Sequence, residues 1–197
     1  TGWFPVPGDP RENYIARMEF VPGTDEVMIQ QLNRLQNTNT VYYGNVNTLA
    51  LRPFYEDHDE AFLNVHDNIV WLEGNKYFTW TSEKDGWRHL YRVTRDGKKE
   101  TLLTKGDFDV INVLRIDPKG GYVYYMASPE SAVEQYLYRS RLDGKGAAER
   151  VTPQGFTGTY SYNISPGAKY ALCGYSNHAT PRVYEMVSLP DHKTGRR

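Results

Sequence analysis

The chain has 197 residues, of which 39% are hydrophobic and 14% aromatic, so its apolar surface is sufficient for the core of one or two domains. A formal net charge of -1 gives no reason to expect a nucleic acid or an anionic membrane surface as a partner. No apolar run approaches the roughly 20 residues that cross a bilayer, and the opening TGWFPVPGDP lacks the charged and apolar regions of a signal peptide. Because the sequence starts without Met, we expect it to be part of a longer protein.

An alternating apolar stretch that ends at a turn residue occurs four times along the chain, and a second alternating stretch follows each one. Alternation with a period of two residues over such short lengths indicates half-buried β-strands. The first strands are predicted at 15–22, 69–74, 110–118 and 160–167, and the second strands at 27–32, 77–82, 122–128 and 170–176. Each pair is therefore the start of one antiparallel unit.

The third predicted strand carries the clearest repeat. A Leu-Tyr-Arg triplet at 90–92 recurs at 137–139 after 47 residues, and a related triplet at 183–185 follows after another 46. In the first two copies an Asp-Gly dipeptide then predicts a hairpin turn. A short fourth strand closes on Thr104 in one copy and on Thr152 in the next, 48 residues later.

A four-stranded antiparallel unit that recurs every 40 to 50 residues is typical of a β-propeller blade. We therefore predict an all-β fold, a partial β-propeller of about four four-stranded blades, with approximate blades at 14–57, 58–109, 110–158 and 159–197. A β-sandwich also suits short strands with frequent turns, but it does not explain the repeat. The final residues resemble a turn that leads to a further strand. This favours the interpretation that the chain is an excerpt of a larger propeller with eight blades.

Three segments resemble the dipeptidyl peptidase IV family of serine peptidases. Residues 82–91 (SEKDGWRHLY) are similar to its blade motif S-E-x-D-G-[YW]-R-H-[IL]-Y, and residues 103–110 (LTKGDFDV) to its L-T-x-G-x-[WF]-x-V. Residues 30–37 (QQLNRLQN) resemble its q-W-l-n-R-x-Q-N, with Leu32 where the family more often has Trp. Together with the spacing of the motifs, the resemblance covers nearly the whole chain.

The resemblance implies a two-domain serine exopeptidase, in which an eight-bladed propeller caps an α/β-hydrolase domain and restricts entry to peptides. Such enzymes remove N-terminal dipeptides after Pro or Ala. The implied partners are the α/β-hydrolase domain of the parent chain and a peptide substrate, and no cofactor is implied. Because family members are commonly exported, the resemblance also implies a periplasmic or extracellular location, such as the cell surface.

The sequence contains no segment that we interpret as catalytic. The nearest match to the G-x-S-x-G nucleophile motif, at 174–178, lacks the second Gly and falls on a predicted strand. The family's double-Glu segment, of the form D-W-x-Y-E-E-E, does not occur. We interpret the acidic cluster at 56–60 around His58 as a solvated loop. The five His residues show no metal-ligand spacing, so no metal site is predicted, and Cys173 is predicted to be a small buried apolar residue.

The segment at 62–67 roughly aligns with a propeller loop that faces the substrate pocket in this family. Its candidate pocket-edge residues are Phe62, Asn64 and His66. The family's Arg-Phe-Arg residues are not reproduced, so any contact with a substrate would be weaker and would lack the bidentate geometry of a guanidinium group. The alternative is that the segment is only the start of an ordinary strand.

Three functions stay open at this point. The chain is the accessory propeller of a prolyl-type dipeptidyl peptidase, the propeller of a related acylaminoacyl or tripeptidyl peptidase, or a non-enzymatic binding propeller of the TolB type. In each case an isolated run of blades leaves its terminal faces uncovered, as repeat arrays without caps do. We therefore expect self-association through these faces.

Overall fold

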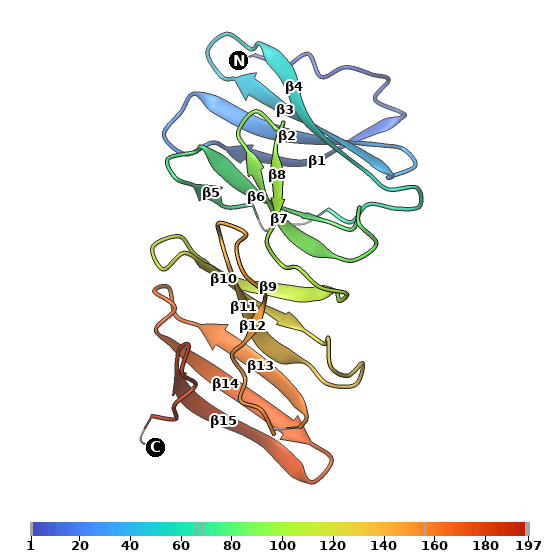
Figure 1. The fold of residues 1–197 in the computed structure, drawn as a ribbon. Coiled ribbons are helices and arrows are strands. Elements are labelled where there is room, and N and C mark those ends of the chain that lie inside the picture. The colour runs from blue at the N-terminus through green and yellow to red at the C-terminus, as the bar shows by residue number, and fades with distance from the viewer. Residues whose placement is uncertain (1, 66, 68, 156, 196–197) are drawn as a thin grey trace. The chain divides into compact units, whose positions relative to one another are not determined.

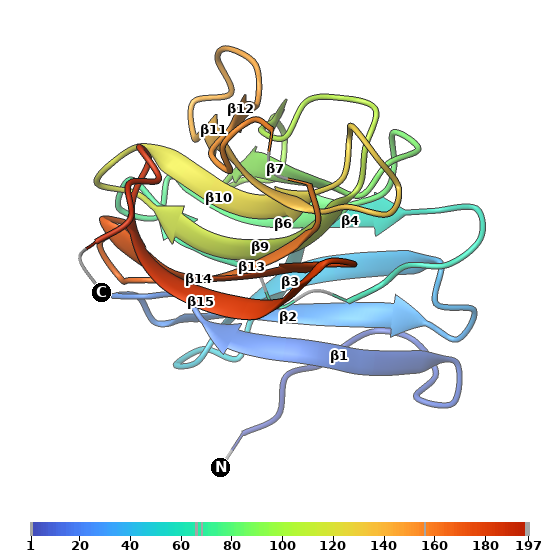
Figure 2. The ribbon, with the colours of Figure 1, turned by 90° about the horizontal axis from the view of Figure 1, so that it is seen from below.

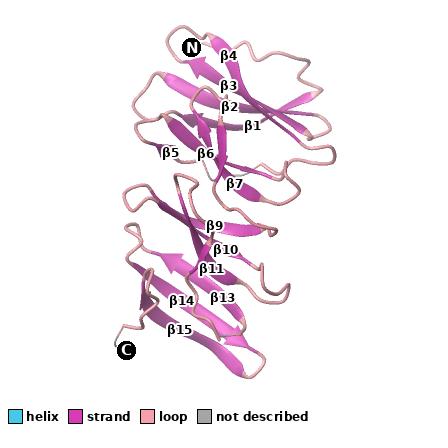
Figure 3. Ribbon diagram, in the orientation of Figure 1, coloured by secondary structure: helices cyan, strands magenta, loops and turns pink. Residues whose placement is uncertain are grey.

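The computed structural model describes residues 2–65, 67, 69–155 and 157–195, and every regular element among them is a β-strand (Figures 1 and 3). The fold is therefore all-β, as predicted. The chain forms two compact units, and both are discontinuous in sequence. Unit 1 consists of Thr1–Gly86 and Tyr91–Glu100, and unit 2 consists of Trp87–Leu90 and Thr101–Arg197.

The first two antiparallel sheets have four strands each. The strands of the first sheet, in the order β1-β2-β3-β4, are Asn13–Phe20, Glu26–Asn33, Thr38–Asn45 and Leu51–His58. Those of the second sheet, in the order β5-β6-β7-β8, are Trp71–Leu72, Tyr77–Ser82, His89–Thr94 and Glu100–Leu102. The first sheet lies wholly in unit 1, whereas β7 and β8 each contribute residues to both units.

The other two sheets belong to unit 2. The third sheet contains β9 to β12 at Val110–Asp117, Tyr122–Ala127, Tyr136–Arg141 and Glu149–Arg150. The fourth contains β13 to β15 at Thr159–Ile164, Tyr170–Asn177 and Thr180–Ser188. In all four sheets, strands that are consecutive in sequence are neighbours in space, as Figure 2 also shows for β1, β2 and β3.

The last sheet has three strands among the described residues, one fewer than the predicted unit. After β15 the chain turns back on itself, because the backbone N–H of Ser188 donates to Lys193 O at 2.9 Å and that of Gly195 donates to Met186 O at 2.8 Å. An isolated antiparallel bridge joins Val187 to Thr194. These residues therefore close the end of β15 and do not form a fourth strand.

The repeat has a physical basis that recurs in two sheets. The backbone N–H of Leu90 donates to Thr104 Oγ1 at 3.0 Å, and that of Leu137 donates to Thr152 Oγ1 at 2.9 Å. Both threonines are almost fully buried. The side chain of each one supplies the acceptor for a buried N–H group that would otherwise have no partner. This requirement explains why threonine recurs after 48 residues.

The Asp-Gly turns also form as predicted. Gly97 and Gly144 both have a φ of 72°, a left-handed conformation that suits glycine. The N–H of Gly97 donates to Thr94 O at 2.8 Å, and that of Gly144 donates to Arg141 O at 3.1 Å. A side chain at position 97 would also collide with the chain, because an added Cβ would lie 2.0 Å from Phe54 O.

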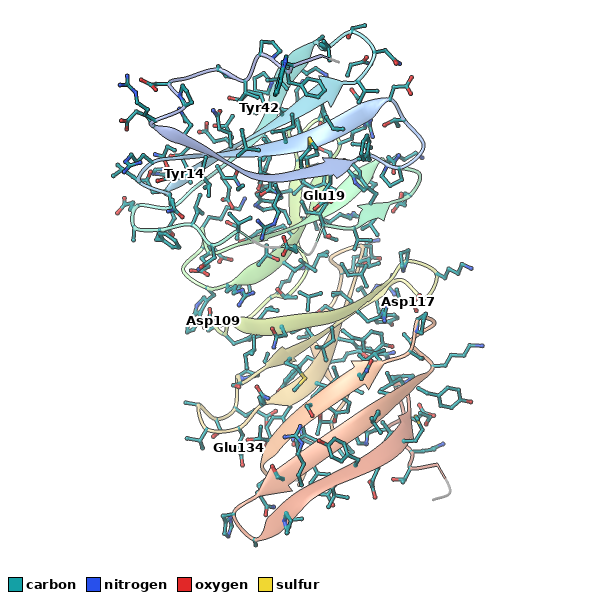
Figure 4. The ribbon with its side chains drawn as sticks, turned by 180° about the vertical axis from the view of Figure 1, so that it is seen from behind. Tyr14, Glu19, Tyr42, Asp109, Asp117 and Glu134 are labelled. Carbon is teal, nitrogen blue, oxygen red and sulfur yellow. The ribbon has the colours of Figure 1, made fainter. Side chains whose placement is uncertain are left out.

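The N-terminal segment covers part of the outer face of the first sheet, which carries Val27, Ile29 and Tyr42. Phe4 packs against this buried cluster, and Tyr42 is labelled in Figure 4. The segment is also fixed by a polar contact, because Gln31 Nε2 donates to the carbonyl oxygen of Pro7 at 2.7 Å. This face is therefore covered by the chain's own N-terminal residues over β2 and β3.

Candidate functional site

The predicted pocket edge is a short loop that is anchored at its start and in its middle. Asp59 Oδ1 accepts two backbone N–H groups, one of them that of Phe62 at 3.2 Å, so the loop opens with an Asx turn. The backbone N–H of Leu63 donates to Gln36 O at 2.7 Å, and the Leu63 side chain is buried. Leu63 therefore anchors the loop and leaves its neighbours, Phe62 and Asn64, at the surface.

Two of the three predicted pocket-edge residues thus share one surface loop. Phe62 keeps 49% of its surface exposed, and Asn64 Nδ2 lies 3.5 Å from Oε1 of Glu83, at the limit of a hydrogen bond. His66 lies outside the described residues. A contact between these residues and a substrate stays a prediction.

An arginine that sequence analysis did not single out reaches this loop. Arg17 in β1 forms an ion pair with Asp67, with Nη2 at 3.3 Å from Oδ2. The hydrogen bond to Asp67 raises the pKa of the Arg17 guanidinium. Because the two residues are 50 positions apart, no local sequence pattern indicates the contact. The Arg17 guanidinium therefore lies beside this loop, although the loop does not reproduce the family's Arg-Phe-Arg residues. Asp67 already pairs with this guanidinium.

The acidic cluster at 56–60 is not a solvated loop, so that interpretation was wrong at Asp57. β4 extends through His58, and only 3% of the Asp57 surface is exposed. Trp80 Nε1 donates to Asp57 Oδ2 and Ser82 Oγ donates to Oδ1, each at 2.8 Å. A buried carboxylate needs such donors. They follow Asp57 by 23 and 25 residues, so the neighbouring sequence gives no sign of them.

The environment of Asp57 indicates a structural function. Burial raises the pKa of its carboxyl group, and the hydrogen bonds from Trp80 and Ser82 oppose that rise, as does the charge of Lys84. Both carboxyl oxygens accept donors from β6, whereas Asp57 itself lies in β4. The side chain therefore joins the first sheet to a strand of the second within unit 1, and it has little surface from which to reach a bound peptide.

The motif that carries the family resemblance forms a second polar contact in unit 1. Lys84 Nζ donates to Glu100 Oε1 at 2.6 Å, and the Tyr55 hydroxyl donates to the same oxygen at 2.7 Å. The Lys84 ammonium also lies 4.6 Å from the centre of the Tyr91 ring, within cation–π range. Burial raises the pKa of Tyr55, which keeps its hydroxyl protonated and able to donate. The motif thus contributes to the packing of the unit.

The serine of the nearest G-x-S-x-G match is a strand residue. Ser176 lies in β14 and pairs with Thr159 of β13. A nucleophile elbow instead places its serine on a sharp turn between a strand and a helix. Cys173, in the same strand, is buried and free, and burial raises the pKa of its thiol.

No group of three or more His, Cys, Asp or Glu side chains in residues 2–65, 67, 69–155 and 157–195 is arranged to hold a metal ion. Over the same part of the chain, no helix has the length and apolar character needed to cross a membrane.

Consecutive antiparallel sheets that repeat every 46 to 48 residues define a partial β-propeller. The sequence profile described as the dipeptidyl peptidase IV (DPP IV) N-terminal region matches residues 3–182. The chain therefore belongs to this family, and it forms part of the propeller region of dipeptidyl peptidase IV-like proteins.

The comparisons with individual proteins agree with this assignment. Dipeptidyl peptidase 4 of Arthroderma otae is 26% identical over 178 residues, which are 87% of this chain and 22% of that protein. A probable dipeptidyl-aminopeptidase B of Coccidioides posadasii is 36% identical over 112 residues, 56% of this chain and 12% of the relative. The chain therefore spans about a fifth or less of these relatives.

Solved structures show the same fold. The crystal structure of Porphyromonas gingivalis dipeptidyl peptidase 4 superposes with a TM-score of 0.81 at 26% identity and covers 96% of this chain and 26% of that chain. A putative dipeptidyl aminopeptidase IV from Bacteroides ovatus gives a TM-score of 0.80 at 22% identity, over 95% of this chain and 29% of that one. The second likeness supports the fold alone.

Proposed function

We propose that the protein containing this chain is a serine exopeptidase that removes N-terminal dipeptides after Pro or Ala, and that this chain forms part of its non-catalytic propeller. The observation that carries the proposal is the match of the family profile over residues 3–182. The named relatives are dipeptidyl peptidases. This favours the proposal over a TolB-type binding propeller and over an acylaminoacyl or tripeptidyl peptidase.

In this proposal the chain acts by controlling access. A propeller over an active site is a size filter, which admits an extended peptide and excludes a folded protein. Carboxylates elsewhere in the propeller hold the amino terminus of the peptide by charge-assisted hydrogen bonds, which sets the distance to the bond that is cleaved. The nucleophile, its base and the orienting acid belong to an α/β-hydrolase domain, and the loop of Phe62 and Asn64 forms one edge of the pocket.

Hydrolysis of a chromogenic Gly-Pro substrate tests the proposal. We expect dipeptide release by the full-length protein that contains this chain, blocked by a serine-directed inhibitor, and no release by the 197 residues alone. Either of two results would contradict this account: dipeptide release by the 197 residues alone, or no dipeptide release by the full-length protein.

Replacing Asn64 in the full-length protein tests the pocket edge. We expect Asn64→Ala to raise KM by up to about tenfold with little change in kcat. The substitution removes a contact that stabilises the bound substrate and the transition state equally. Leu35→Ala is the matched control, since Leu35 is an exposed residue of the same unit outside the loop. If both variants keep the original KM, the loop is the start of an ordinary strand and does not contact substrate.

We also propose a periplasmic or extracellular location for the protein. The family resemblance is the support for this proposal. Fractionation of the source cells tests it, and recovery of the protein only with cytosolic markers would contradict it.

A further inference from the structure

A small cavity in unit 1 is walled on one side by the pocket-edge loop. Leu63 and Asn64 contribute that wall, and Gln30, Asn39 and Asp57 line the cavity from the first sheet. The space open to the centre of a water-sized sphere is about 10 Å³. A cavity needs roughly 10–15 Å³ by this kind of measure to hold one water molecule. The cavity is therefore large enough for about one water and too small for an organic ligand.

Two amide groups in this cavity are buried and incompletely hydrogen-bonded. Asn39 Nδ2 donates to Gln30 Oε1 at 3.0 Å. The remaining polar atoms of the two side chains, Gln30 Nε2 and Asn39 Oδ1, have no hydrogen-bond partner among the described residues. Both residues are more than nine-tenths buried. Thr81, which also lines the cavity, has a buried hydroxyl oxygen without a partner in the described part of the chain as well. An unpartnered buried polar atom costs about 1–3 kcal/mol, so three such atoms in the lining of one cavity require an explanation.

The orientation of the amides does not remove this requirement. The oxygen and nitrogen of an amide side chain can be exchanged by rotation. If both amides are rotated, Gln30 donates to Asn39, and one oxygen of Gln30 and one nitrogen of Asn39 are left over. In either arrangement the pair leaves one donor and one acceptor. A molecule that satisfies both amides from within the cavity must therefore accept one hydrogen bond and donate another.

This donor and acceptor balance selects the chemical class of the occupant. A metal cation accepts no hydrogen bond from an amide N–H, and an anion donates none. Water does both. A buried water typically makes about three hydrogen bonds, and Asp57 can supply the third. Each carboxylate oxygen has more than one acceptor position, and each accepts one donor from β6.

We propose that this cavity is a binding site for a single structural water, which accepts a hydrogen bond from the Gln30 amide and donates to the Asn39 amide and to Asp57. The site links β2, β3 and β4 beneath the loop of Leu63 and Asn64, and thereby supports the position of that loop. This site follows from the fold alone and does not depend on peptidase activity.

An atomic-resolution crystal structure of the chain tests the site. We expect one peak of solvent density, at roughly 2.7–3.2 Å from the Gln30 amide, the Asn39 amide and Asp57. In solution we expect a cross-relaxation signal between water and the Asn39 or Gln30 side-chain amide protons. Asn39→Leu is expected to abolish the peak and the signal. Thr40→Val is the matched control, because the Thr40 side chain lies on the opposite face of β3 and both observations should survive there.

The same measurements contain the results that would overturn the proposal. An empty cavity, or Gln30 and Asn39 amides that both bond directly to protein atoms, would refute a water site. A peak surrounded by five or more oxygens at roughly 2.3–2.6 Å would identify a cation. If Asn39→Leu does not fold, the water signal at the Gln30 and Asn39 amides of the unaltered chain still decides the question.

Discussion

The outer faces of the first and last sheets are alike in sequence character and different in burial. The first sheet carries Ile29 on this face, and Ile29 is 3% exposed because Phe4 and its neighbours cover it. The last sheet carries Leu172 and Met186 opposite one another, and they are 43% and 54% exposed. Tyr170 and Tyr184 on the same face are also exposed. What covers a sheet, and not the composition of its strands, therefore decides whether an apolar position belongs to the core.

The cover on the first sheet is itself incomplete. β1 places Met18 opposite Ile29 and Phe20 opposite Val27, so all four residues share one face. Met18 and Phe20 are nevertheless largely exposed. The N-terminal segment thus protects β2 and β3 and leaves β1 uncovered. Exposed apolar strips of this kind mark interaction surfaces.

Truncation of equivalent apolar positions should show the largest difference between the two faces. We expect Ile29→Ala to lower the free energy of unfolding by about 2–5 kcal/mol, because it leaves a cavity in a packed region. Leu172→Ala should change it by less than about 0.5 kcal/mol, as surface substitutions do. Urea denaturation at low protein concentration measures both. Equal losses would show that the face of the last sheet is covered in solution.

Adding a side chain below Phe4 should lower the free energy of unfolding by less than Ile29→Ala does. An added Cβ at Gly44 would lie 2.6 Å from Cε1 of Phe4, so Gly44→Ala must displace the ring or the strand. We expect a loss of about 1–3 kcal/mol, the usual range for overpacking. The loss should shrink in a Phe4→Ala background, because the colliding ring is gone. A double-mutant cycle measures this coupling, and additive losses would mean that Phe4 does not cover this face.

The uncovered face should also be visible as concentration-dependent self-association. We expect sedimentation velocity to show dimers or larger species whose fraction rises with concentration. The double substitution Leu172→Lys and Met186→Lys should reduce that fraction, because it places charges on the exposed apolar face. Monomer at every concentration would contradict the expectation. Association that is unchanged by the two lysines would place the interface elsewhere, as on Met18 and Phe20 of β1.

Much of the fold was predictable because its signals are local. The predicted strand at 77–82 coincides with β6, and the predicted strand at 27–32 lies inside β2. Alternation predicts such strands, and Asp-Gly predicts the turns after β7 and β11. The recurrence of Thr104 and Thr152 reflects one hydrogen bond that both sheets require. The residues after β15 were interpreted from the sequence as a turn, and among the described residues hydrogen bonds around Ser188 and Gly195 do turn the chain back.

The site was less predictable because its contacts join distant segments. The loop of Phe62 and Asn64 was suggested by the family resemblance, and Leu63 anchors it in the structure. The burial of Asp57 was missed because its donors, Trp80 and Ser82, lie in another sheet. The pairing of Arg17 with Asp67 was missed for the same reason. Charged clusters in sequence therefore do not indicate exposure when a later strand supplies buried donors.

An experimental structure of the full-length protein that contains this chain tests the central claim most directly, since the claim is that these sheets are consecutive blades around one axis. We expect another antiparallel sheet to cover the face of Tyr170, Leu172, Tyr184 and Met186, with the four sheets placed radially. If that face is open to solvent, or if the four sheets stack in two layers as a sandwich, the propeller account is contradicted.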